Sequence, residues 1–336
     1  MKKIIILLLL ILPFKVCALS IPSNNAILID QDSGRILYKK NINEKRLIAS
    51  TTKIMTAIIA IEEGNLDDNV LIKDNVLKSQ GSGIYIKPGE IITLRDLLYG
   101  LLLRSGNDAA LAIEEYLGGK EEFISKMNKK AKEIGMNNTI FFNSSGLDEE
   151  GGNFSTVYDM AILMKYANNN YSFREINSTK YHEVETNLNY YTWNNKNKLL
   201  YMYKYANGGK TGYTKKAGRT LVTSASKNDL NLIVVTFLDK DDFNTHKKLY
   251  EYGFNNYKNY LILNKKNIRI KGYKNAFIKN NYYYPMMDSE KKYIKTKAII
   301  NKKNNTLGYI KVLFKGKEVH RETLYIWFYI LIMIYF

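Results

Sequence analysis

The sequence predicts an α+β fold in which helices flank an antiparallel sheet, followed by a small all-β domain. Hairpin patterns stand near both ends of residues 19–258, and the stretch between them has the 3.6-residue apolar period of helices. After residue 259 the pattern changes to short alternating runs typical of strands. With 336 residues, the chain is long enough for one large domain with a substantial core and one small domain.

Residues 1–18 predict a secretory signal peptide. A short basic start precedes an apolar run, and residues 16–18 are suitable for cleavage after Ala18. Cys17 is the single cysteine, so the mature chain would hold neither a disulfide nor a thiol nucleophile. A lipid-modified Cys17 is less favoured, because Lys15 and Val16 stand where small or neutral residues are expected. The mature protein is therefore expected to leave the cytoplasm.

The predicted sheet is built from both ends of the large domain. Residues 26–38 are two apolar runs around Asp32-Ser33-Gly34, which predicts a hairpin. Residues 219–226 and 230–237 flank a Lys-Asn-Asp turn and predict a second hairpin. Because the helical stretch lies between the hairpins, we expect one antiparallel sheet with a helical insert.

The helical insert has its own start and stop signals. Gly64 and Gly135 fall just past predicted helix ends, while Thr93 (with Asp96) and Ser155 are predicted N-caps. The insert is expected to contain helices near residues 50–63, 93–104, 108–117, 120–134 and 156–167. Residues 241–257 predict a further helix that closes the domain against the sheet.

Residues 259–323 predict the β-rich domain, with strands such as 267–271 and 307–314. The last stretch, 324–336, contains no charged residue. As a helix it would reach about 20 Å at ~1.5 Å per residue, short of the ~30 Å hydrocarbon core, so partial membrane insertion is favoured over spanning. Trp327 and the neighbouring tyrosines suit the bilayer interface. A final apolar strand or helix packed on the β domain is the alternative.

The chain is strongly basic, with a formal net charge of +18, or +15 once the three lysines of the signal peptide are removed. Outside the cytoplasm, this charge favours an anionic membrane surface or acidic wall polymer as partner, and not nucleic acid. A solvated surface of biased composition would explain the charge equally well.

Three histidines, His182, His246 and His320, are scattered along the chain, and none neighbours a candidate nucleophile. This spacing argues against a zinc site and against a serine hydrolase with a histidine base. We expect no metal or cofactor, and expect each histidine to be at the surface or half-buried.

Ser50 and Lys53 form the first candidate pair. Residues three apart on a helix share a face, so the Lys53 amine can accept the proton of the Ser50 hydroxyl if it is itself neutral. Burial in this apolar helix would lower the pKa of Lys53 and make it a base. Two other S-x-x-K matches, Ser224 to Lys227 on a predicted strand and Ser289 to Lys292 in a polar stretch, lack this setting.

Two further short motifs accompany this pair. Ser105-Gly106-Asn107 lies on a predicted tight corner between two helices, although Asn107 could equally be a helix cap. Lys210-Thr211-Gly212 precedes the strand at residue 219, and its glycines would let a substrate approach the backbone. A simple glycine-rich turn is the alternative for this segment.

In this order, the three motifs resemble the active-site set of penicillin-binding proteins and serine β-lactamases. The flanks "IASTTKIMTA", "LLLRSGNDAALAI" and "GGKTGYTKKAGRTLVTSA" resemble the low-molecular-mass penicillin-binding proteins that are D-alanyl-D-alanine carboxypeptidases. The resemblance covers about residues 26–258 and implies a penicillin-binding, β-lactamase-like transpeptidase fold. Residues 259–323 would correspond in placement to that family's C-terminal domain.

The resemblance also implies a role for each residue. Ser50 would attack the carbonyl between two D-alanines of a peptidoglycan stem peptide, with Lys53 as base, Ser105 as proton relay and Asn107 as orienting group. Lys210 would supply positive charge near Ser105. The substrate-binding residues would be Thr211, Gly212 and Tyr213, with Thr211 on the terminal carboxylate and the N–H groups of Ser50 and Tyr213 as oxyanion hole. Penicillins would acylate Ser50.

The chain departs from the family pattern at Ile48, Asn207 and Tyr213, where proline, an acidic residue and often histidine are usual. Asn207 puts the local strand packing in doubt, and Tyr213 bears on deacylation. A DD-endopeptidase or transpeptidase of the same fold, a serine β-lactamase and a catalytically silent wall-binding protein are the alternatives.

Overall fold

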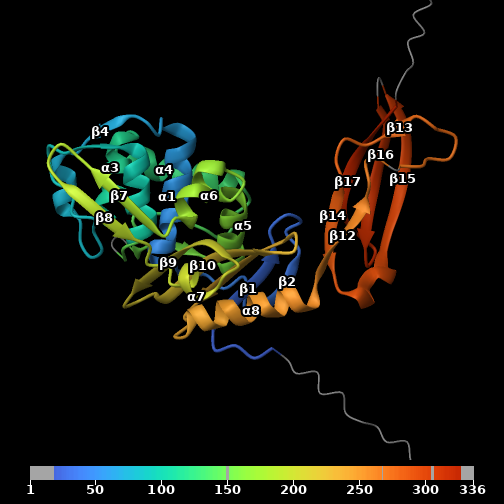
Figure 1. Ribbon diagram of the computed structural model, residues 1–336, viewed down its shortest axis with the longest axis horizontal. Coiled ribbons are helices and arrows are strands. Elements are labelled where there is room, and N and C mark those ends of the chain that lie inside the picture. The colour runs from blue at the N-terminus through green and yellow to red at the C-terminus, as the bar shows by residue number, and fades with distance from the viewer. Residues whose placement is uncertain (1–18, 149–150, 267, 304–305, 327–336) are drawn as a thin grey trace, which may run out of the picture.

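The computed structural model describes residues 19–148, 151–266, 268–303 and 306–326. Figure 1 shows a large domain of helices and sheet, joined through a long helix to an elongated β domain. The predicted signal peptide, including Cys17, and residues 327–336 of the predicted tail lie outside the described residues. No helix among the described residues is long and apolar enough to cross a membrane.

The sheet of the large domain has five antiparallel strands in the order β2-β1-β11-β10-β9. Strand β1 (Asn25–Asp30) pairs with β2 (Ile36–Lys40), and β10 (Gly218–Lys227) pairs with β11 (Leu230–Phe237), so both predicted hairpins are confirmed. The turn of the second hairpin has positive φ at Asn228 and Asp229, as a two-residue hairpin turn requires. Because β1 also pairs with β11, the two ends of the domain form one sheet, as predicted.

Strand β9 (Ala206–Thr214) was not predicted. It pairs with β10 and forms one edge of the sheet, so its outer side has no strand partner in the order of the sheet. It contains Lys210-Thr211-Gly212, and the alternative of a glycine-rich turn for this segment is therefore wrong.

The helical insert agrees with the predicted pattern at most positions. The structure has α1 (Lys53–Glu63), α2 (Leu94–Tyr99), α3 (Asn107–Tyr116), α4 (Lys120–Glu133) and α5 (Val157–Ala167). Thr93 caps α2 by accepting from the Asp96 N–H at 3.0 Å. The cap predicted at Ser155 is wrong by one residue, because the Thr156 hydroxyl accepts from the Asp159 N–H.

Several short elements were not predicted, since they hold few periodic positions. They are α6 (Tyr171–Ser178), the hairpin of β7 (Tyr181–Glu185) and β8 (Tyr190–Asn194), α7 (Leu199–Met202), and the two-stranded pairs β3 (Arg46–Leu47) with β6 (Phe154–Ser155) and β4 (Asn69–Leu71) with β5 (Ile91–Thr93). Helix α6 contacts β9 and covers the beginning of that strand.

Helix α1 runs through the core of the large domain. All of its first eight residues are buried, from Lys53 to Ala60, which agrees with a helix that is apolar on nearly every side. A 3-10 turn, Ala49–Thr52, precedes the helix and carries Ser50. The central position of α1 therefore places a lysine amine inside the domain.

His246 differs from expectation. It is fully buried in helix α8 (Asp242–Asn256), where its ring nitrogens lie 2.7 Å from Thr223 Oγ1 and 3.0 Å from Thr236 Oγ1. Burial lowers the pKa of His246 to about 3, so the ring is neutral and ties α8 to the sheet. His182 and His320 are half-buried, as expected.

The β domain follows α8 directly, close to the predicted boundary. Strands β12 (Lys258–Leu263) and β14 (Tyr282–Met286) form a pair, and the remaining strands form a sheet in the order β13-β17-β16-β15. Their bounds are β13 (Ala276–Phe277), β15 (Ile294–Lys303), β16 (Thr306–Phe314) and β17 (Lys317–Ile326). The strand predicted at 307–314 is confirmed, whereas residues 268–271 form no strand.

The first residues of the predicted tail belong to the β domain instead. Leu324 is fully buried, and residues 324–326 continue β17 in register with β16 and β13. For these residues the apolar character is explained by packing in a sheet.

Arg35, in the turn between β1 and β2, joins the two domains. Its Nη2 donates to both carboxylate oxygens of Glu290 at 2.8 and 2.9 Å, and its Nη1 donates to the Pro285 carbonyl. The guanidinium also lies 4.4 Å from the ring centroid of Phe314 and 5.2 Å from that of Tyr284. One arginine thus makes ionic and aromatic contacts with the β domain.

Candidate active site

Lys53 is the centre of the candidate site. Its Nζ lies 3.2 Å from Ser50 Oγ, 2.6 Å from Asn107 Oδ1 and 2.5 Å from the carbonyl oxygen of Ser145. The Lys53 side chain is fully buried, whereas Ser50 is partly exposed. The predicted meeting of Ser50 and Lys53 is therefore found in the structure.

Burial determines the charge of this amine. It lowers the pKa of Lys53 to about 7, with Asp108 opposing the shift and Lys196 adding to it. A large fraction of Lys53 is therefore neutral near pH 7 and can accept a proton from Ser50. Nucleophile and base within hydrogen-bond reach, with a third group orienting the base, is the arrangement of an activated serine.

Asn107 is fixed in the orientation that Lys53 needs. Its Nδ2 donates to the Gln80 carbonyl at 2.5 Å, so Oδ1 faces the lysine. A π-helical turn, Gly100–Arg104, follows α2 and ends at Ser105, which has a left-handed backbone (φ 62°). This corner brings Ser105 and Asn107 to the same place, as predicted, and Asn107 begins α3 while also contacting Lys53.

Lys210 approaches the site from β9. It is almost fully buried, and its Nζ donates to the Thr211 carbonyl at 2.8 Å. Burial and the neighbouring Lys53 and Lys196 hold the pKa of Lys210 well below its usual value. Two buried lysines with lowered pKa values at one place are typical of a functional site.

Gly212 allows β9 to approach Ser50 closely. A β-carbon at Gly212 would lie 3.0 Å from the Ser50 backbone nitrogen and 2.4 Å from Thr220 Oγ1. The Thr220 hydroxyl in turn donates to the Ile48 carbonyl at 3.0 Å. The backbone around residue 212 therefore lies against the turn that carries Ser50, and only glycine fits there.

The site opens into a cavity of about 310 Å³. Its lining consists of Ser50, Ser82, Ser105, Lys196, Lys198, Thr211, Gly212, Tyr213, Arg219, Asp242 and Phe243. Five of the eight predicted site residues line this cavity, and the other three, Lys53, Asn107 and Lys210, are buried at the same site.

Some lining residues were not predicted from the sequence. Lys196 donates to Ser82 Oγ at 3.1 Å, and Arg219 forms a two-bond ion pair with Asp242. A sequence motif could not have linked these residues, because Lys196 and Ser82 lie in separate loops, while Arg219 lies in β10 and Asp242 in α8. The sequence held one signal for Arg219. This residue begins the predicted strand that follows the Lys210 motif, nine residues after Lys210.

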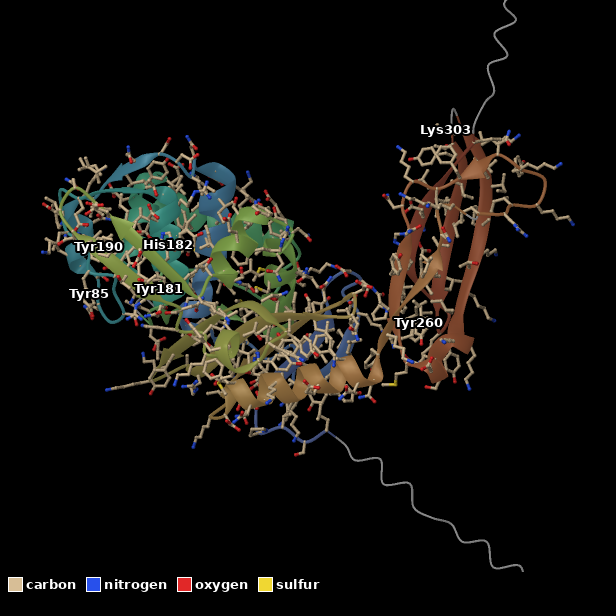
Figure 2. All side chains as sticks on the ribbon, viewed as in Figure 1. Tyr85, Tyr181, His182, Tyr190, Tyr260 and Lys303 are labelled. Carbon is tan, nitrogen blue, oxygen red and sulfur yellow. The ribbon has the colours of Figure 1, made fainter. Side chains whose placement is uncertain are left out.

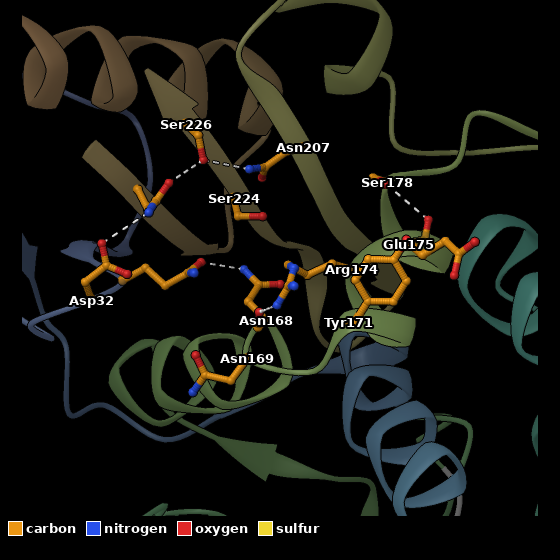
Figure 3. A pocket seen from close by; sticks show the side chains of 12 residues that line it. Asp32, Asn168, Asn169, Tyr171, Arg174, Glu175, Ser178, Asn207, Ser224 and Ser226 are labelled. Carbon is orange, nitrogen blue, oxygen red and sulfur yellow. Dashed lines mark hydrogen bonds between the residues drawn. The ribbon is translucent and has the colours of Figure 1, made fainter. Parts of the chain in front are cut away.

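The other S-x-x-K matches lie elsewhere. Ser224 lines a separate hollow of about 560 Å³ between α6 and the beginning of β9, with Asn168, Arg174 and Asn207 (Figure 3). Ser289 and Lys292 lie in a 3-10 helix, Asp288–Tyr293, of the β domain.

Two departures from the family pattern have structural explanations. The Ile48 side chain is fully buried, and its carbonyl accepts from Thr51 and Thr220. Asn207 donates to Ser226 Oγ at 2.8 Å (Figure 3), and β9 keeps its pairing with β10 beside it. The register passes from Gly208 with Ser224 to Ala206 with Ala225, so Asn207 lies at an irregularity of β9 and the strand is paired on either side of it.

Among the residues that the structure describes, no cluster of histidine, cysteine, aspartate and glutamate could hold a metal ion. The groups that can perform chemistry at this site are the hydroxyls of Ser50 and Ser105, the amines of the buried lysines and the backbone N–H groups.

Comparisons with known proteins agree with this geometry. A family model described as D-alanyl-D-alanine carboxypeptidase (Peptidase_S11) matches residues 13–241. The chain is similar to D-alanyl-D-alanine carboxypeptidase DacF of Bacillus subtilis, with 35% identity over 327 residues that cover 90% of this chain and 84% of that protein.

Solved structures give the same result for the fold. Penicillin binding protein 6B from Escherichia coli superposes with a TM-score of 0.74 at 27% identity, covering 93% of this chain and 97% of that one. Streptomyces K15 DD-transpeptidase has a TM-score of 0.66 at 32% identity and covers 70% of this chain and 99% of that one. The chain has the fold of the penicillin-binding DD-peptidases and is a serine-type peptidase of the D-alanyl-D-alanine carboxypeptidase family.

Proposed function

We propose that this enzyme removes the terminal D-alanine from peptidoglycan stem peptides through an acyl-enzyme on Ser50, and so limits cross-linking of the wall. The observation that carries the proposal is the buried Lys53 amine, within hydrogen-bond reach of Ser50 Oγ and held by Asn107 Oδ1. Family membership supplies the substrate class.

Acylation uses the residues in a fixed order. Ser50 Oγ attacks the carbonyl carbon between the two D-alanines while Lys53 accepts its proton. The backbone N–H groups of Ser50 and Tyr213 bind the oxyanion, since β9 lies against the Ser50 turn at Gly212. The C–N bond then breaks, and the leaving amine takes a proton relayed through Ser105.

Lys210 and Thr211 hold the other end of the substrate. Lys210 is buried beside the cavity, and in its protonated form it supplies positive potential near Ser105. The Thr211 hydroxyl lines the cavity and binds the terminal carboxylate. Water then cleaves the ester on Ser50 and releases the shortened peptide. Penicillins acylate the same serine, because their β-lactam carbonyl is placed as the peptide carbonyl is.

A transpeptidase is the alternative with a specific observation in its favour, since the solved Streptomyces relative is named a DD-transpeptidase. A transpeptidase passes the same acyl group to an amine and not to water. A serine β-lactamase has the same fold but hydrolyses penicillin rapidly. A catalytically silent wall-binding protein has the same fold but forms no acyl-enzyme.

One experiment separates these functions. The mature protein is incubated with a fluorescent penicillin, and separately with a peptide ending in D-Ala-D-Ala, with and without an amine acceptor. The proposal predicts a lasting adduct that is absent in Ser50→Ala, together with D-alanine release that needs no acceptor. Rapid penicillin turnover indicates a lactamase, acceptor-dependent release indicates a transpeptidase, and no adduct contradicts an active enzyme.

We also propose that residues 1–18 direct export and that the β domain contacts an anionic membrane surface. Residues 259–326 contain sixteen Lys and Arg but four Asp and Glu, a net formal charge of +12. The four acidic residues are already paired, through Asp288 with Lys258, Glu290 with Arg35, Glu318 with Lys311 and Glu322 with His320. Most of the lysine charge is therefore available to an anionic partner.

The end of the β domain farthest from the large domain combines lysines with aromatic rings. Figure 2 shows Lys303 at this end. In the strand register, Lys303 lies opposite Thr306, and Thr306 lies opposite Tyr325. The ring of Tyr325 stacks on that of Phe277 with 5.4 Å between the ring centroids, and Lys279 Nζ lies 4.7 Å from the Tyr325 centroid. Lysines beside aromatic rings suit the membrane interface.

Vesicle sedimentation tests this contact. Binding of the mature protein to vesicles with anionic lipid should exceed binding to zwitterionic vesicles, fall with added salt, and fall again in a Lys279→Gln, Lys303→Gln variant. Removal of residues 327–336 tests the apolar tail separately. Equal binding to both vesicle types would contradict an electrostatic contact.

A further inference from the structure

A polar hollow lies between α6 and the beginning of β9, and Figure 3 shows Ser224 of β10 in its middle. Ser224 is only 2% exposed, yet among the described residues no group is hydrogen-bonded to its hydroxyl. A buried hydroxyl without a partner has lost the hydrogen bonds that water would give it. The hollow has a volume of about 560 Å³, within the usual range of ~300–1,000 Å³ for ligand sites. A ligand in the hollow would supply the missing partner.

The walls of the hollow consist mainly of amide and hydroxyl side chains that hold one another in place. Asn207 Nδ2 donates to Ser226 Oγ at 2.8 Å, and Ser226 Oγ donates to Asn231 Oδ1 at 2.6 Å (Figure 3). At the end of α5, Asn168 Nδ2 donates to Gln31 Oε1 at 2.7 Å. An amide carries donors and an acceptor in one plane, so these side chains suit a ligand with neighbouring hydroxyl and amide groups.

Asn207 lines the hollow at an irregularity of β9. Gly208 pairs with Ser224 and Ala206 pairs with Ala225, so Asn207 is the extra residue between two paired positions. An extra residue in a strand changes the direction of its side chain. The family pattern usually has an acidic residue at this position, and this chain has a neutral amide there. The substitution removes a charge from the lining of the hollow.

A second hollow of about 610 Å³ adjoins the first and shares three lining residues with it. It extends to Asn259 and Tyr283, in strands β12 and β14 of the β domain. We call the two hollows together the amide groove. One exposed tyrosine lines each hollow, Tyr171 with 71% and Tyr283 with 45% of its surface exposed. An exposed aromatic ring offers a flat apolar face on which the C–H groups of a sugar ring can pack.

The amide groove is nearly neutral, although the chain has a formal net charge of +18. The charged residues that line it are three acidic and two basic ones, Asp32, Glu175, Asp229, Arg174 and Lys227. The two cations already have partners. Arg174 Nη1 donates to the Asn168 carbonyl at 2.6 Å, and Lys227 Nζ lies 4.9 Å from the ring centroid of Tyr205. The groove therefore suits a neutral ligand better than an anionic one.

We propose that the amide groove binds the glycan of the wall, a polymer of N-acetylated sugars, and holds the enzyme on the polymer whose stem peptides it shortens. The proposal rests on the proposed function for the identity of the polymer and on the groove itself for the class of ligand. Each sugar carries ring hydroxyls and an acetamido group, which match the donors and acceptors of the lining. The rings of Tyr171 and Tyr283 pack on the sugar faces.

The amide groove lies on the same face of the sheet as the Ser50 turn. Thr220 and Ser224 are four residues apart on β10, so their side chains share a face, about 13 Å apart at ~3.3 Å per residue. The Thr220 hydroxyl contacts the backbone that leads into the Ser50 turn. Along β9, the groove lies beyond Thr211, which holds the terminal carboxylate in the proposed reaction. The stem peptide enters from the other end, so a glycan in the groove leaves the cavity free.

The test measures glycan binding with the catalytic cavity blocked. The mature protein is acylated with a penicillin and titrated with the tetramer of N-acetylglucosamine, while NMR follows the side-chain amides of asparagine. A second arm sediments the protein with wall glycan from which the stem peptides have been removed. We expect saturable binding of the tetramer, equal with and without penicillin, and co-sedimentation with the stripped glycan. The tetramer of glucose, which lacks acetamido groups, should bind at least about threefold more weakly.

Variants of the lining locate the site. Ser224→Ala and Asn207→Ala should each raise the Kd of the N-acetylated tetramer by about 3- to 10-fold, as expected for the loss of one neutral hydrogen bond. Tyr171→Ala should raise it by a similar factor, because a sugar face loses its ring. Tyr190→Ala is the matched control. It removes a tyrosine of β8 that is 60% exposed and does not line the groove, so this variant should bind as the wild type does.

Each result decides the proposal. No saturable binding of the tetramer would overturn it, as would equal Kd values in wild type, Ser224→Ala and Tyr171→Ala. Loss of binding on acylation would place the sugar in the catalytic cavity and also overturn it. Tetramer binding without co-sedimentation would contradict attachment to the wall. If penicillin formed no adduct, the proposed function would fail, and the same titration of the unblocked protein would still test the groove. If Ser224→Ala did not fold, the exposed Tyr171→Ala would decide.

Discussion

Lys53 and Asn107 come from different helices, and their side chains meet inside the large domain with 2.6 Å between Nζ and Oδ1. The amide that orients the amine is itself held, because its Nδ2 donates to the Gln80 carbonyl. The position of the base therefore depends on the corner that begins α3 as well as on α1. This dependence gives the first prediction.

Asn107→Ala should slow acylation of Ser50 by roughly 100-fold, as when a group that positions a general base is lost. Asn107→Asp should slow it at neutral pH for a different reason. A carboxylate 2.6 Å from Nζ would favour protonated Lys53 and raise its pKa. Stopped-flow acylation by a fluorescent penicillin distinguishes the two, because the Asn107→Asp variant should recover as the pH rises. Wild-type rates in both variants would contradict the orienting role.

Gly212→Ala should abolish or strongly reduce acylation while the domain remains folded. The added methyl group would lie 3.0 Å from the Ser50 nitrogen and 2.4 Å from Thr220 Oγ1, so β9 must move away from the nucleophile. The measurement is adduct formation together with thermal unfolding. Gly272→Ala is the control for acylation, since Gly272 lies in the β domain and a β-carbon there meets no atom within 4 Å. Its left-handed backbone (φ 83°) should cost some stability, but its acylation should match the wild type.

Lys53 should also make stability depend on pH. Its native pKa of about 7 lies below the unfolded value of 10.5, so between these pH values the unfolded chain binds one proton more than the native state. The free energy of unfolding should therefore rise with pH across this range, by up to about 1.4 kcal/mol per pH unit. Lys53→Met removes this contribution. The free energy of unfolding of the wild type minus that of the variant, measured by denaturant unfolding, should therefore increase from pH 7 to 10. A constant difference would mean that Lys53 titrates normally.

The junction of the domains should depend on Arg35. Arg35→Ala removes the bidentate pair with Glu290 and the contacts with Tyr284 and Phe314, so limited proteolysis near residue 258 should become faster. Activity on a soluble peptide should stay the same, because the site lies wholly in the large domain. A double-mutant cycle with Glu290→Gln measures the coupling, and coupling near zero would contradict a joint role.

Local spacing explains what the sequence alone could predict. Ser50 and Lys53 share a helical repeat, and both predicted hairpins have turns and alternation that fix their pairing. The region 93–104 was predicted as one helix, but its last residues form a π-helical turn that sets Ser105 in the left-handed region. The spacing of apolar residues over this short stretch does not distinguish an α-helical turn from a π-helical turn, so the sequence did not predict the change.

Other features depend on contacts between distant segments. The Ser145 carbonyl that accepts from Lys53 is a backbone atom 92 residues away, and no side-chain pattern could indicate it. Asp242 fell within the predicted helix 241–257 without any sign of a partner, and its pairing with Arg219 follows from the packing of α8 on β10. His246 was expected near the surface, because a polar residue in an amphipathic helix gives no sign of buried threonine partners across the sheet.

The pH dependence of acylation tests the central claim most directly. If neutral Lys53 is the base for Ser50, the rate of acylation by a fluorescent penicillin should rise through an inflection near pH 7 in the wild type, following its pKa of about 7. Intact-mass measurement should place the adduct on Ser50, and Lys53→Ala should remain folded but form the adduct at least about 1,000-fold more slowly, as expected when the base for a nucleophile is lost. A rate that is flat from pH 5 to 9, or Lys53→Ala acylating at the wild-type rate, would contradict the account.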